Sequence, residues 1–476
     1  MRWPVAELPN VLAGRYASAA MVGIWSPEHK IVLERELWLA VLRAQRDLGV
    51  ELPDGVVEAY EAVIDHVDLK SIATRERESR HDVKARIDEF CALAGHEHIH
   101  RAMTSRDLTE NVEQLQIRAA LELVRARSIA VLGRLGRLAV EHRALAMVAR
   151  THNVPAQVTT LGKRFATAAS ELLHATERVG ALLASYPLRG IKGPVGTQQD
   201  QLELLGGADA VAELDRRVRT HLGFDAELDS VGQVYPRSLD FEVVSALVQL
   251  ASAPANVATS IRLMAGHDLV TEGFRPGQVG SSAMPHKMNT RSCERVNGLA
   301  HVLHGHLAMV TSLTGDQWNE GDVSCSVVRR VALPDAFFAL DGLFETVLTV
   351  LDEFGVFTPV VERELEQYLP FLATTAVLAA AVDAGLGREQ AHELIRRHAI
   401  DAALAARTDP APVGLMERLI AAPEFPLDAA QLEGVLADPE RFSGRAGSQI
   451  DAVFAKIEAL GKADPDAYAY TPESIL

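Results

Sequence analysis

The chain has 476 residues, of which 48% are hydrophobic and 23% are charged, so it can bury a sizeable core and lacks the composition of a disordered protein. The formal net charge of −17 argues against a nucleic-acid partner, because proteins that bind nucleic acids normally present a basic face. It does not exclude a small anionic substrate, which needs only a local cluster of Arg and Lys.

Cysteines and apolar runs set further limits. Cys91, Cys293 and Cys325 are too few and too scattered for a disulfide framework or a Cys-based zinc site. The first residues, MRWPVAELPN, lack the charged and then apolar regions of a signal peptide. No apolar run reaches the roughly 18 residues of a membrane span. These features predict a soluble, cytoplasmic protein that does not bind a membrane.

The first elements along the chain are short helices followed by a very long one. Breaks such as Pro27 and Gly55 interrupt the pattern before about residue 110, which predicts a small N-terminal helical domain. From about residue 111 to 150, apolar residues recur at alternating steps of four and three. This pattern predicts one helix of about 60 Å, a length typical of bundles and coiled coils.

Three more long helices are predicted farther along the chain. One starts at Phe165, one runs from Val244 to Ala265 with a kink at Pro254, and one runs from Leu333 to Leu351. Long helices side by side form a bundle, and the apolar surface that remains predicts a homo-oligomer.

Proline and glycine breaks after about residue 365 predict a small C-terminal helical domain. The prediction is therefore an all-α protein with an N-terminal helical domain (1–110), a central long-helix bundle (111–365) and a C-terminal helical domain (366–476).

Polar residues gather where the helical patterns stop. Thr104 and Ser105 precede the first long helix, where they suit either N-capping or the binding of an anion at the helix start. His81, between Arg80 and Asp82, suits either a solvated surface or a tuned acid or base, and His152, before a turn-like break, has the same two interpretations.

A metal site is disfavoured. His96, His98 and His100 alternate along the chain, but that spacing places ligands on one face only in a strand. No matching carboxylate or cysteine site follows them.

The most distinctive segment is GQVGSSAMPHKMNTRSCE, residues 277–294. The residue two places after either serine is not the glycine of a nucleophile elbow, and Lys287 does not follow a glycine as in a P-loop. What remains is a glycine-rich loop whose serine could lose its proton near Lys287 and backbone amides.

This loop closely resembles the signature G-S-S-x-M-P-x-K-x-N of the fumarase/aspartase superfamily. The segments GRYAS, RHDVKA, TSRD, RTHNVPAQVTTLGKR, KGPVGTQ and GQVYPR resemble the adenylosuccinate lyase family in their order, and GLGREQAHELIRRHA is similar to the start of its C-terminal domain. The resemblance implies a homotetramer with a shared central bundle, whose active sites each draw residues from three chains.

The implied reaction is a β-elimination of fumarate in purine nucleotide biosynthesis. Its substrates are adenylosuccinate, which gives AMP, and the succinyl-aminoimidazole carboxamide ribotide. The partner is thus a small anionic purine nucleotide adduct, and neither a cofactor nor a metal is implied.

The resemblance assigns catalytic roles to five residues. Ser281 would remove a proton from the carbon next to a carboxylate, and His152 would protonate the leaving nitrogen. Glu294 would hold His152 and keep it protonated. Lys287 would bind a succinyl carboxylate, and His81 would lie near the phosphate or the transferring proton.

The implied substrate-binding residues fall into three groups. Those at the succinyl carboxylates, beside Lys287, are Asn289, Thr104 and Ser105. Those that flank His81 or hold the substrate are Arg80, Asp82 and Gln233. Those at the nucleotide, mainly its phosphate, are Arg15, Tyr16, Arg295, Ser326 and Arg330.

The chain also departs from the family pattern. The family commonly has Arg-Asn-Pro after the loop lysine, where Met288 and Thr290 here flank the asparagine. The family often has an arginine where this chain has Gly321, and Arg329 or another nearby residue is the expected replacement. Two alternatives stay open: another elimination of the argininosuccinate or cycloisomerase type, and a non-catalytic structural protein on the same fold.

Overall fold

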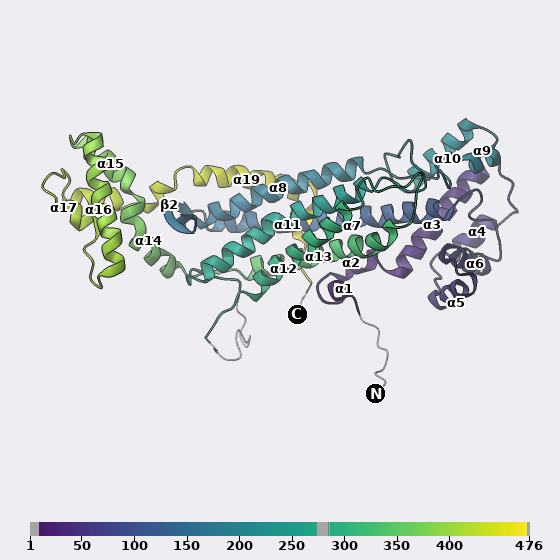
Figure 1. Ribbon diagram of the computed structural model, residues 1–476, viewed down its shortest axis with the longest axis horizontal. Coiled ribbons are helices and arrows are strands. Elements are labelled where there is room, and N and C mark those ends of the chain that lie inside the picture. The colour runs from purple at the N-terminus through teal and green to yellow at the C-terminus, as the bar shows by residue number, and fades with distance from the viewer. Residues whose placement is uncertain (1–8, 274–283, 285, 474–476) are drawn as a thin grey trace.

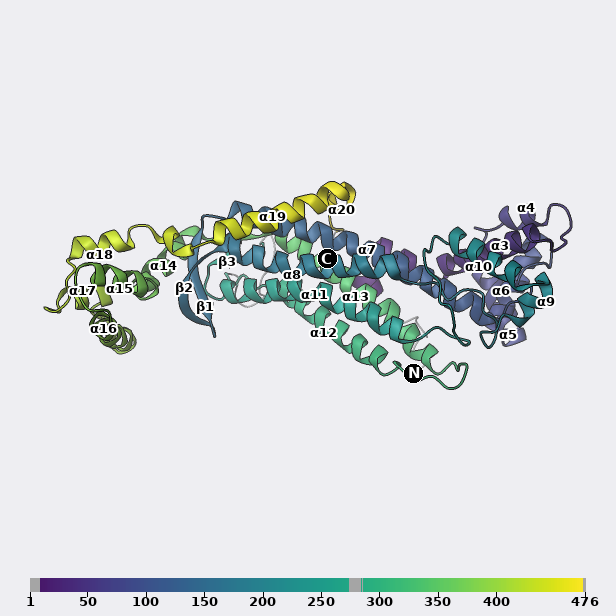
Figure 2. The same cartoon turned by 90° about the horizontal axis from the view of Figure 1, so that it is seen from above.

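The computed structural model describes residues 9–273, 284 and 286–473 of the chain. Helices account for most of these residues, and the molecule is elongated (Figure 1). Short helices gather at each end, and long helices run side by side between them (Figures 1 and 2). The predicted all-α class with a long central bundle is confirmed.

The N-terminal helices cover one end of the molecule. They are α1 (Val11–Arg15), α2 (Ala19–Ile24), α3 (Pro27–Asp47), α4 (Val56–Glu61), α5 (Leu69–Ser79) and α6 (Asp82–Ala94). The longest, α3, starts with Ser26, whose hydroxyl accepts a hydrogen bond from the His29 N–H at 3.2 Å. Its buried residues, among them Trp38, pack against Tyr60 and Phe90.

Five long helices form the central bundle: α7 (Ser105–Glu141), α8 (Leu161–Ser185), α11 (Ser238–Ala265), α12 (Arg291–Thr311) and α13 (Cys325–Glu353). The predicted apolar stripe of α7 is buried, as Ile117, Leu121 and Val124 illustrate. Side chains three and four apart share one face of a helix, so this stripe faces the bundle core.

The predicted end of the first long helix is wrong. The helix ends at Glu141, and residues 142–150 do not continue it. Instead β1 (Ala146–Thr151) pairs with β2 (Val154–Thr160) in an antiparallel hairpin. The apolar spacing alone did not predict this change from helix to strand. The valines and threonines that occur in both strands favour extended backbone.

The C-terminal helices cover the other end and then return. They are α14 (Thr358–Leu372), α15 (Thr374–Asp383), α16 (Arg388–Thr408), α17 (Leu415–Ile420), α18 (Ala429–Leu436) and the 3₁₀ helix η1 (Pro439–Ser443). The chain then runs back along α7 and α8 as α19 (Ala446–Ala463) and α20 (Pro465–Ala469). Gly133 and Gly136 of α7 allow this close approach, since a Cβ there would lie 3.0 Å from Tyr468 and 3.1 Å from Ile457.

The remaining elements join these regions. They are α9 (Gln199–Leu205), α10 (Ala208–His221), β3 (Val270–Thr271) and β4 (Gly355–Val356). Helix α10 packs against α3, and α19 packs against α7, so packing does not follow chain order. The division at residues 110 and 365 remains a prediction.

One described helix, α11, is long and apolar enough to cross a membrane, with a mean hydropathy of 1.2 over 18 residues. The prediction that no such run exists therefore does not hold for α11. Within the chain, 56% of that window is buried, and α11 packs against α8, α12 and α13. Helices α14 and α15 meet the same criterion only if taken together across a 45° bend.

Candidate active site

The junction of α5 and α6 holds three of the predicted site residues. His81 is the N-cap of α6, and its Nδ1 accepts a hydrogen bond from the Lys84 N–H at 3.1 Å. A neutral ring therefore carries its proton on Nε2, which leaves that atom as a donor. The His81 side chain is 53% exposed. Arg80 has a positive φ of 52°, which turns the chain sharply into α6.

Asp82 completes this group. Burial opposes its ionisation, but Arg86 at 3.3 Å and the Val83 N–H outweigh burial and lower the pKa of Asp82. Arg80, His81 and the ionised Asp82 are therefore three consecutive polar residues at the protein surface.

The start of α7 is fixed by a buried carboxylate. Asp107 Oδ2 accepts a hydrogen bond from the Thr104 N–H at 2.8 Å. Its Oδ1 accepts hydrogen bonds from Arg189 Nη1 at 2.6 Å and from the backbone of Lys192 and Gly193 at 3.0 and 2.9 Å. Thr104 is thereby held against the segment KGPVG at the positive end of a long helix, where an anion is stabilised.

A second segment packs beside this helix start. The Gln233 N–H donates to the Glu320 carbonyl at 2.5 Å. Gly321 has a φ of +151°, and a Cβ on it would lie 2.7 Å from the Gln233 Cβ. An arginine at position 321 would require this packing to change, so the departure from the family pattern has a steric basis in this chain.

The first turns of α13 carry Ser326 and Arg330. Arg106 of α7 donates a hydrogen bond from Nη2 to Ser326 Oγ at 3.0 Å. Arg330 lies one turn farther along α13 and is exposed.

Arg329 is not the replacement for the missing arginine, contrary to the first expectation. It is 3% exposed and donates to Asp240 Oδ2 at 2.7 Å, to Glu113 and to the Tyr235 hydroxyl. Although burial favours the neutral acid, Arg329 lowers the pKa of Glu113 to about 2. A guanidinium that is buried and paired in this way has no free face for a ligand.

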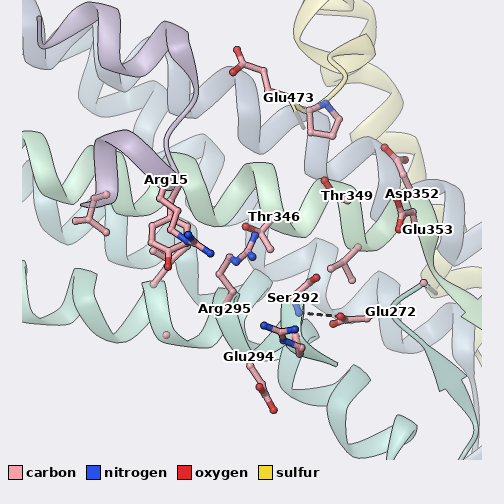
Figure 3. A pocket seen from close by; sticks show the side chains of 18 of the residues that line it. Arg15, Glu272, Ser292, Glu294, Arg295, Thr346, Thr349, Asp352, Glu353 and Glu473 are labelled. Atoms are coloured by element: carbon pink, nitrogen blue, oxygen red, sulfur yellow. Dashed lines mark hydrogen bonds between the residues drawn. The ribbon is translucent and has the colours of Figure 1, made fainter. Parts of the chain in front are cut away.

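A cavity of about 1220 Å³ lies between α1, α12, α13 and the C-terminal segment (Figure 3). Arg15 and Arg295 reach into the same part of it, and the Arg295 guanidinium lies 5.6 Å from the ring centroid of Tyr16. The carboxylates of Asp352 and Glu473 line other parts of the wall. An anionic ligand would therefore bind at the arginine end.

Glu272 holds the base of the signature segment. Its two carboxylate oxygens accept hydrogen bonds from the backbone of Ser292 and Cys293, at 2.9 and 2.8 Å, and so cap the start of α12 (Figure 3). Since β3 precedes Glu272 and pairs with β4, Glu272 links this strand pair to the start of α12.

Of the signature segment, the structure describes residues 284 and 286–294. Ser281 lies outside the described residues. Lys287 is exposed, Asn289 is half-buried, and the Lys287 N–H donates to the Met284 carbonyl at 3.0 Å. Glu294, on the first turn of α12, is turned away from Arg15 and Arg295 (Figure 3).

His152 lies in the turn between β1 and β2, in agreement with the turn predicted from its sequence. His152 and Asn153 have φ values of 52° and 61°, the combination of a type I′ turn. Arg150 donates to Glu364 of α14 at 2.5 Å, which ties the hairpin to the C-terminal helices. Within the described chain, His152 makes no ion pair with Glu294, whose partner is Arg262 at 3.9 Å.

One chain therefore does not gather all the predicted residues. The His152 hairpin lies beside the C-terminal helices, whereas α6, next to His81, lies at the opposite end of the molecule (Figures 1 and 2). Thr104, Gln233 and Ser326 belong to a third group, where α7, the 232–233 segment and α13 begin or meet.

One of the three alternating histidines, His100, is engaged within the N-terminal helices. His100 Nδ1 accepts a hydrogen bond from Trp38 Nε1 at 3.0 Å, and burial lowers the pKa of His100 to about 4. Among the described residues, no cluster of three or more His, Cys, Asp or Glu side chains could hold a metal ion.

Three residues that organise these groups were not predicted to belong to the site: Arg106, Arg189 and Glu272. Arg106 stands inside the segment TSRD, and Arg189 stands three residues before KGPVGTQ. Arg106 contacts Ser326, 220 residues away, and Arg189 contacts Asp107, 82 residues away, so no local spacing could have identified these two contacts. The partners of Glu272 lie 20 and 21 residues away.

Two family models and several relatives match the chain. A family model described as "Lyase" matches residues 17–305, and one described as "Adenylosuccinate lyase C-terminus" matches residues 370–453. The chain is 34% identical to the adenylosuccinate lyase of Saccharomyces cerevisiae, over 94% of this chain and 93% of that protein. It is 33% identical to the adenylosuccinate lyase of Schistosoma mansoni, over 98% and 96%.

Solved structures share the fold. The 3-carboxy-cis,cis-muconate lactonizing enzyme from Pseudomonas putida matches with a TM-score of 0.82 and 20% identity, over 95% of this chain and 99% of that one. A fumarate lyase from Mesorhizobium sp. BNC1 matches with a TM-score of 0.79 and 22% identity, over 93% and 98%. At such identities the likeness concerns the fold alone.

Proposed function

Because the chain belongs to the adenylosuccinate lyase family, we propose that it splits adenylosuccinate into AMP and fumarate in purine nucleotide biosynthesis. The same site would release fumarate from the succinyl-aminoimidazole carboxamide ribotide. Both reactions break a C–N bond by β-elimination, so the enzyme is a C–N lyase.

The elimination needs a base, an acid and a site for negative charge. Ser281 is the proposed base and takes the proton from the carbon next to a carboxylate. His152 is the proposed acid and protonates the leaving nitrogen. The intermediate carries extra negative charge on that carboxylate, and Lys287 and Asn289 would stabilise it as preorganised donors.

The start of α7 would assist at the same carboxylates. Thr104 is fixed by the buried Asp107, so its hydroxyl and that of Ser105 would meet the substrate without reorganisation. Gln233, packed on Gly321, would hold the substrate nearby.

The nucleotide would bind at arginines. Arg15, Tyr16 and Arg295 line one cavity, where a guanidinium fork suits phosphate oxygens. Arg80, His81 and Asp82 would contribute an exposed second group, and Ser326 and Arg330 a third. Glu294 would hold His152 after assembly, because the two do not meet within one chain.

A homotetramer with sites shared between three chains would bring these groups together. The observation that supports it is the separation of the His152 hairpin from the His81 group along one chain (Figures 1 and 2). Exposed apolar side chains on the bundle helices also favour burial against other copies, namely Leu263, Val302, Val327 and Val331. The three cysteines are buried free thiols, which suits the proposed cytoplasmic location.

The test is to incubate the protein with adenylosuccinate and, separately, with argininosuccinate, and to quantify the fumarate released. We expect release of AMP and fumarate from adenylosuccinate only. Turnover of argininosuccinate alone would contradict the proposal, and release of fumarate from neither would favour the non-catalytic alternative.

A further inference from the structure

An arginine that the predicted site did not include lies in contact with one of its members. Arg106 is the second residue of α7, and its guanidinium reaches the first turn of α13, 220 residues farther along the chain. Nη2 donates to Ser326 Oγ at 3.0 Å, and Nη1 donates to Glu110 Oε1 at 3.1 Å. The side chain keeps 15% of its surface exposed, so a ligand can reach it.

The carboxylate that pairs with Arg106 is shared with another arginine. Glu110 Oε1 also accepts a hydrogen bond from Arg237 Nη2 at 2.9 Å, so one carboxylate serves two guanidinium groups. Arg329 forms ion pairs with Asp240 and Glu113.

The guanidinium group of Arg237 also lacks hydrogen-bond acceptors. It is 3% exposed, and its Nε and Nη1 are buried without a hydrogen-bond partner among the described residues. Asp322 also feels the charge of Arg237, but its Oδ1 accepts hydrogen bonds from the backbone and hydroxyl of Ser324. An anionic ligand would supply the acceptor that the cluster lacks.

Position 321 cannot supply a cation to this place. Gly321 lies against Gln233, where even a Cβ would come within 2.7 Å of the Gln233 Cβ. Arg329 is enclosed by its own partners. Arg106 is the arginine whose guanidinium contacts Ser326, which with Arg330 forms one exposed edge of α13.

We propose that Arg106 binds the phosphate of the substrate together with Ser326 and Arg330, in the role that an arginine at position 321 would otherwise have. This inference rests on the proposed function. Two guanidinium groups and a hydroxyl on two helices make a set of donors suited to the oxygens of a phosphate monoester.

The test compares two glutamine variants of arginines on the same helix. Arg106→Gln removes the charge at Ser326. Arg118→Gln is the matched control, since Arg118 also pairs with a glutamate four residues later, Glu122, at 3.2 Å but lies away from Ser326. For each protein, the inhibition constants of AMP, adenosine and fumarate are measured against adenylosuccinate cleavage, and AMP binding is measured directly by calorimetry.

We expect Arg106→Gln to weaken AMP binding by about tenfold or more, since a charged hydrogen bond to phosphate is lost. Adenosine and fumarate should bind within about twofold of the wild type, and Arg118→Gln should change none of the three. A loss confined to fumarate would show that Arg106 binds a succinyl carboxylate, and unchanged binding of all three ligands would show that it binds neither group; both results overturn the proposal.

A folding defect does not prevent the test. Arg106→Lys keeps the charge, and calorimetry needs no turnover. If Arg106→Gln fails to fold, Arg106→Lys should bind AMP more weakly than the wild type with adenosine binding unchanged, and wild-type AMP affinity in that variant would overturn the proposal. A wild-type protein that binds no AMP would contradict the proposed function itself.

Discussion

Asp107 and Arg189, neither of which is exposed, are joined by a hydrogen bond of 2.6 Å between Oδ1 and Nη1. The same carboxylate also accepts hydrogen bonds from the backbone of Thr104, Lys192 and Gly193. The pair therefore fastens the segment 189–193 to the start of the longest helix, where the proposed carboxylate-binding residues lie.

The Asp107→Asn variant tests this anchor. It leaves the buried guanidinium of Arg189 without its charged partner, which should lower the free energy of unfolding by about 3–5 kcal/mol. Urea denaturation measures the change. Asp88→Asn is the control, because Asp88 pairs with Lys84 on the surface, and it should cost less than about 1 kcal/mol. Equal stabilities of the two variants would contradict the role given to Asp107.

Ser281→Ala and His152→Ala should each abolish most turnover of adenylosuccinate. His152 is exposed in a tight turn, so its removal should leave the fold intact, and circular dichroism checks this. His174→Ala, at an exposed histidine of α8, is the control and should keep wild-type turnover. Unchanged turnover in either active-site variant would defeat the assigned role.

Glu272→Gln tests how the base of the signature segment is held. Neutralising this carboxylate weakens two hydrogen bonds to the first N–H groups of α12, so stability should fall by about 1–2 kcal/mol. Because the segment carrying Ser281 starts here, kcat should fall severalfold while KM changes little. Steady-state kinetics and thermal unfolding measure both effects. Wild-type values for both would show that Glu272 does not hold the segment.

Glu345 should make stability depend on pH. Burial and the neighbouring Asp341 raise the pKa of Glu345 from 4.5 to about 7. The folded protein thus holds a proton that the unfolded chain releases above pH 4.5. The stability contributed is complete below pH 4.5 and is lost as the pH rises through about 7, by an amount on the order of 3 kcal/mol.

The protonation of Glu345 also affects the C-terminal segment that lines the cavity. Glu345 accepts hydrogen bonds from the Tyr470 hydroxyl at 2.9 and 3.0 Å and from the Glu473 N–H at 2.7 Å, so it holds the C-terminal segment in place. Glu345→Gln should flatten the fall in unfolding free energy between pH 4.5 and 7, measured by denaturant titration at several pH values. A wild-type slope in the variant would assign the dependence to another group.

Sequence periodicity predicted the long helices because burial on one helix face is a local property. The stripe through Ile117, Leu121 and Val124 is buried as expected. The same stripe did not reveal that the helix ends at Glu141, since Leu145 continues its spacing although the chain then turns into a strand. Backbone pairing between β1 and β2 decides that boundary.

The candidate site was predictable only in part, for the same physical reason. Short polar segments identified His81, Thr104 and His152 at the ends of elements, where the structure has them. The contact of Arg106 with Ser326 joins residues far apart in the chain, and no local pattern specifies such a contact. In the proposed assembly, the groups that share one active site would come from neighbouring subunits, and no pattern within one chain specifies that.

The most direct test of the shared site is to mix two inactive variants, His152→Ala and Ser281→Ala. After the mixture is unfolded and reassembled in equal amounts, a site that takes position 152 from one chain and position 281 from another is intact in about one case in four. Turnover should then return to about a quarter of the wild-type value. Mixed oligomers, verified by mass spectrometry, that remain inactive would contradict it.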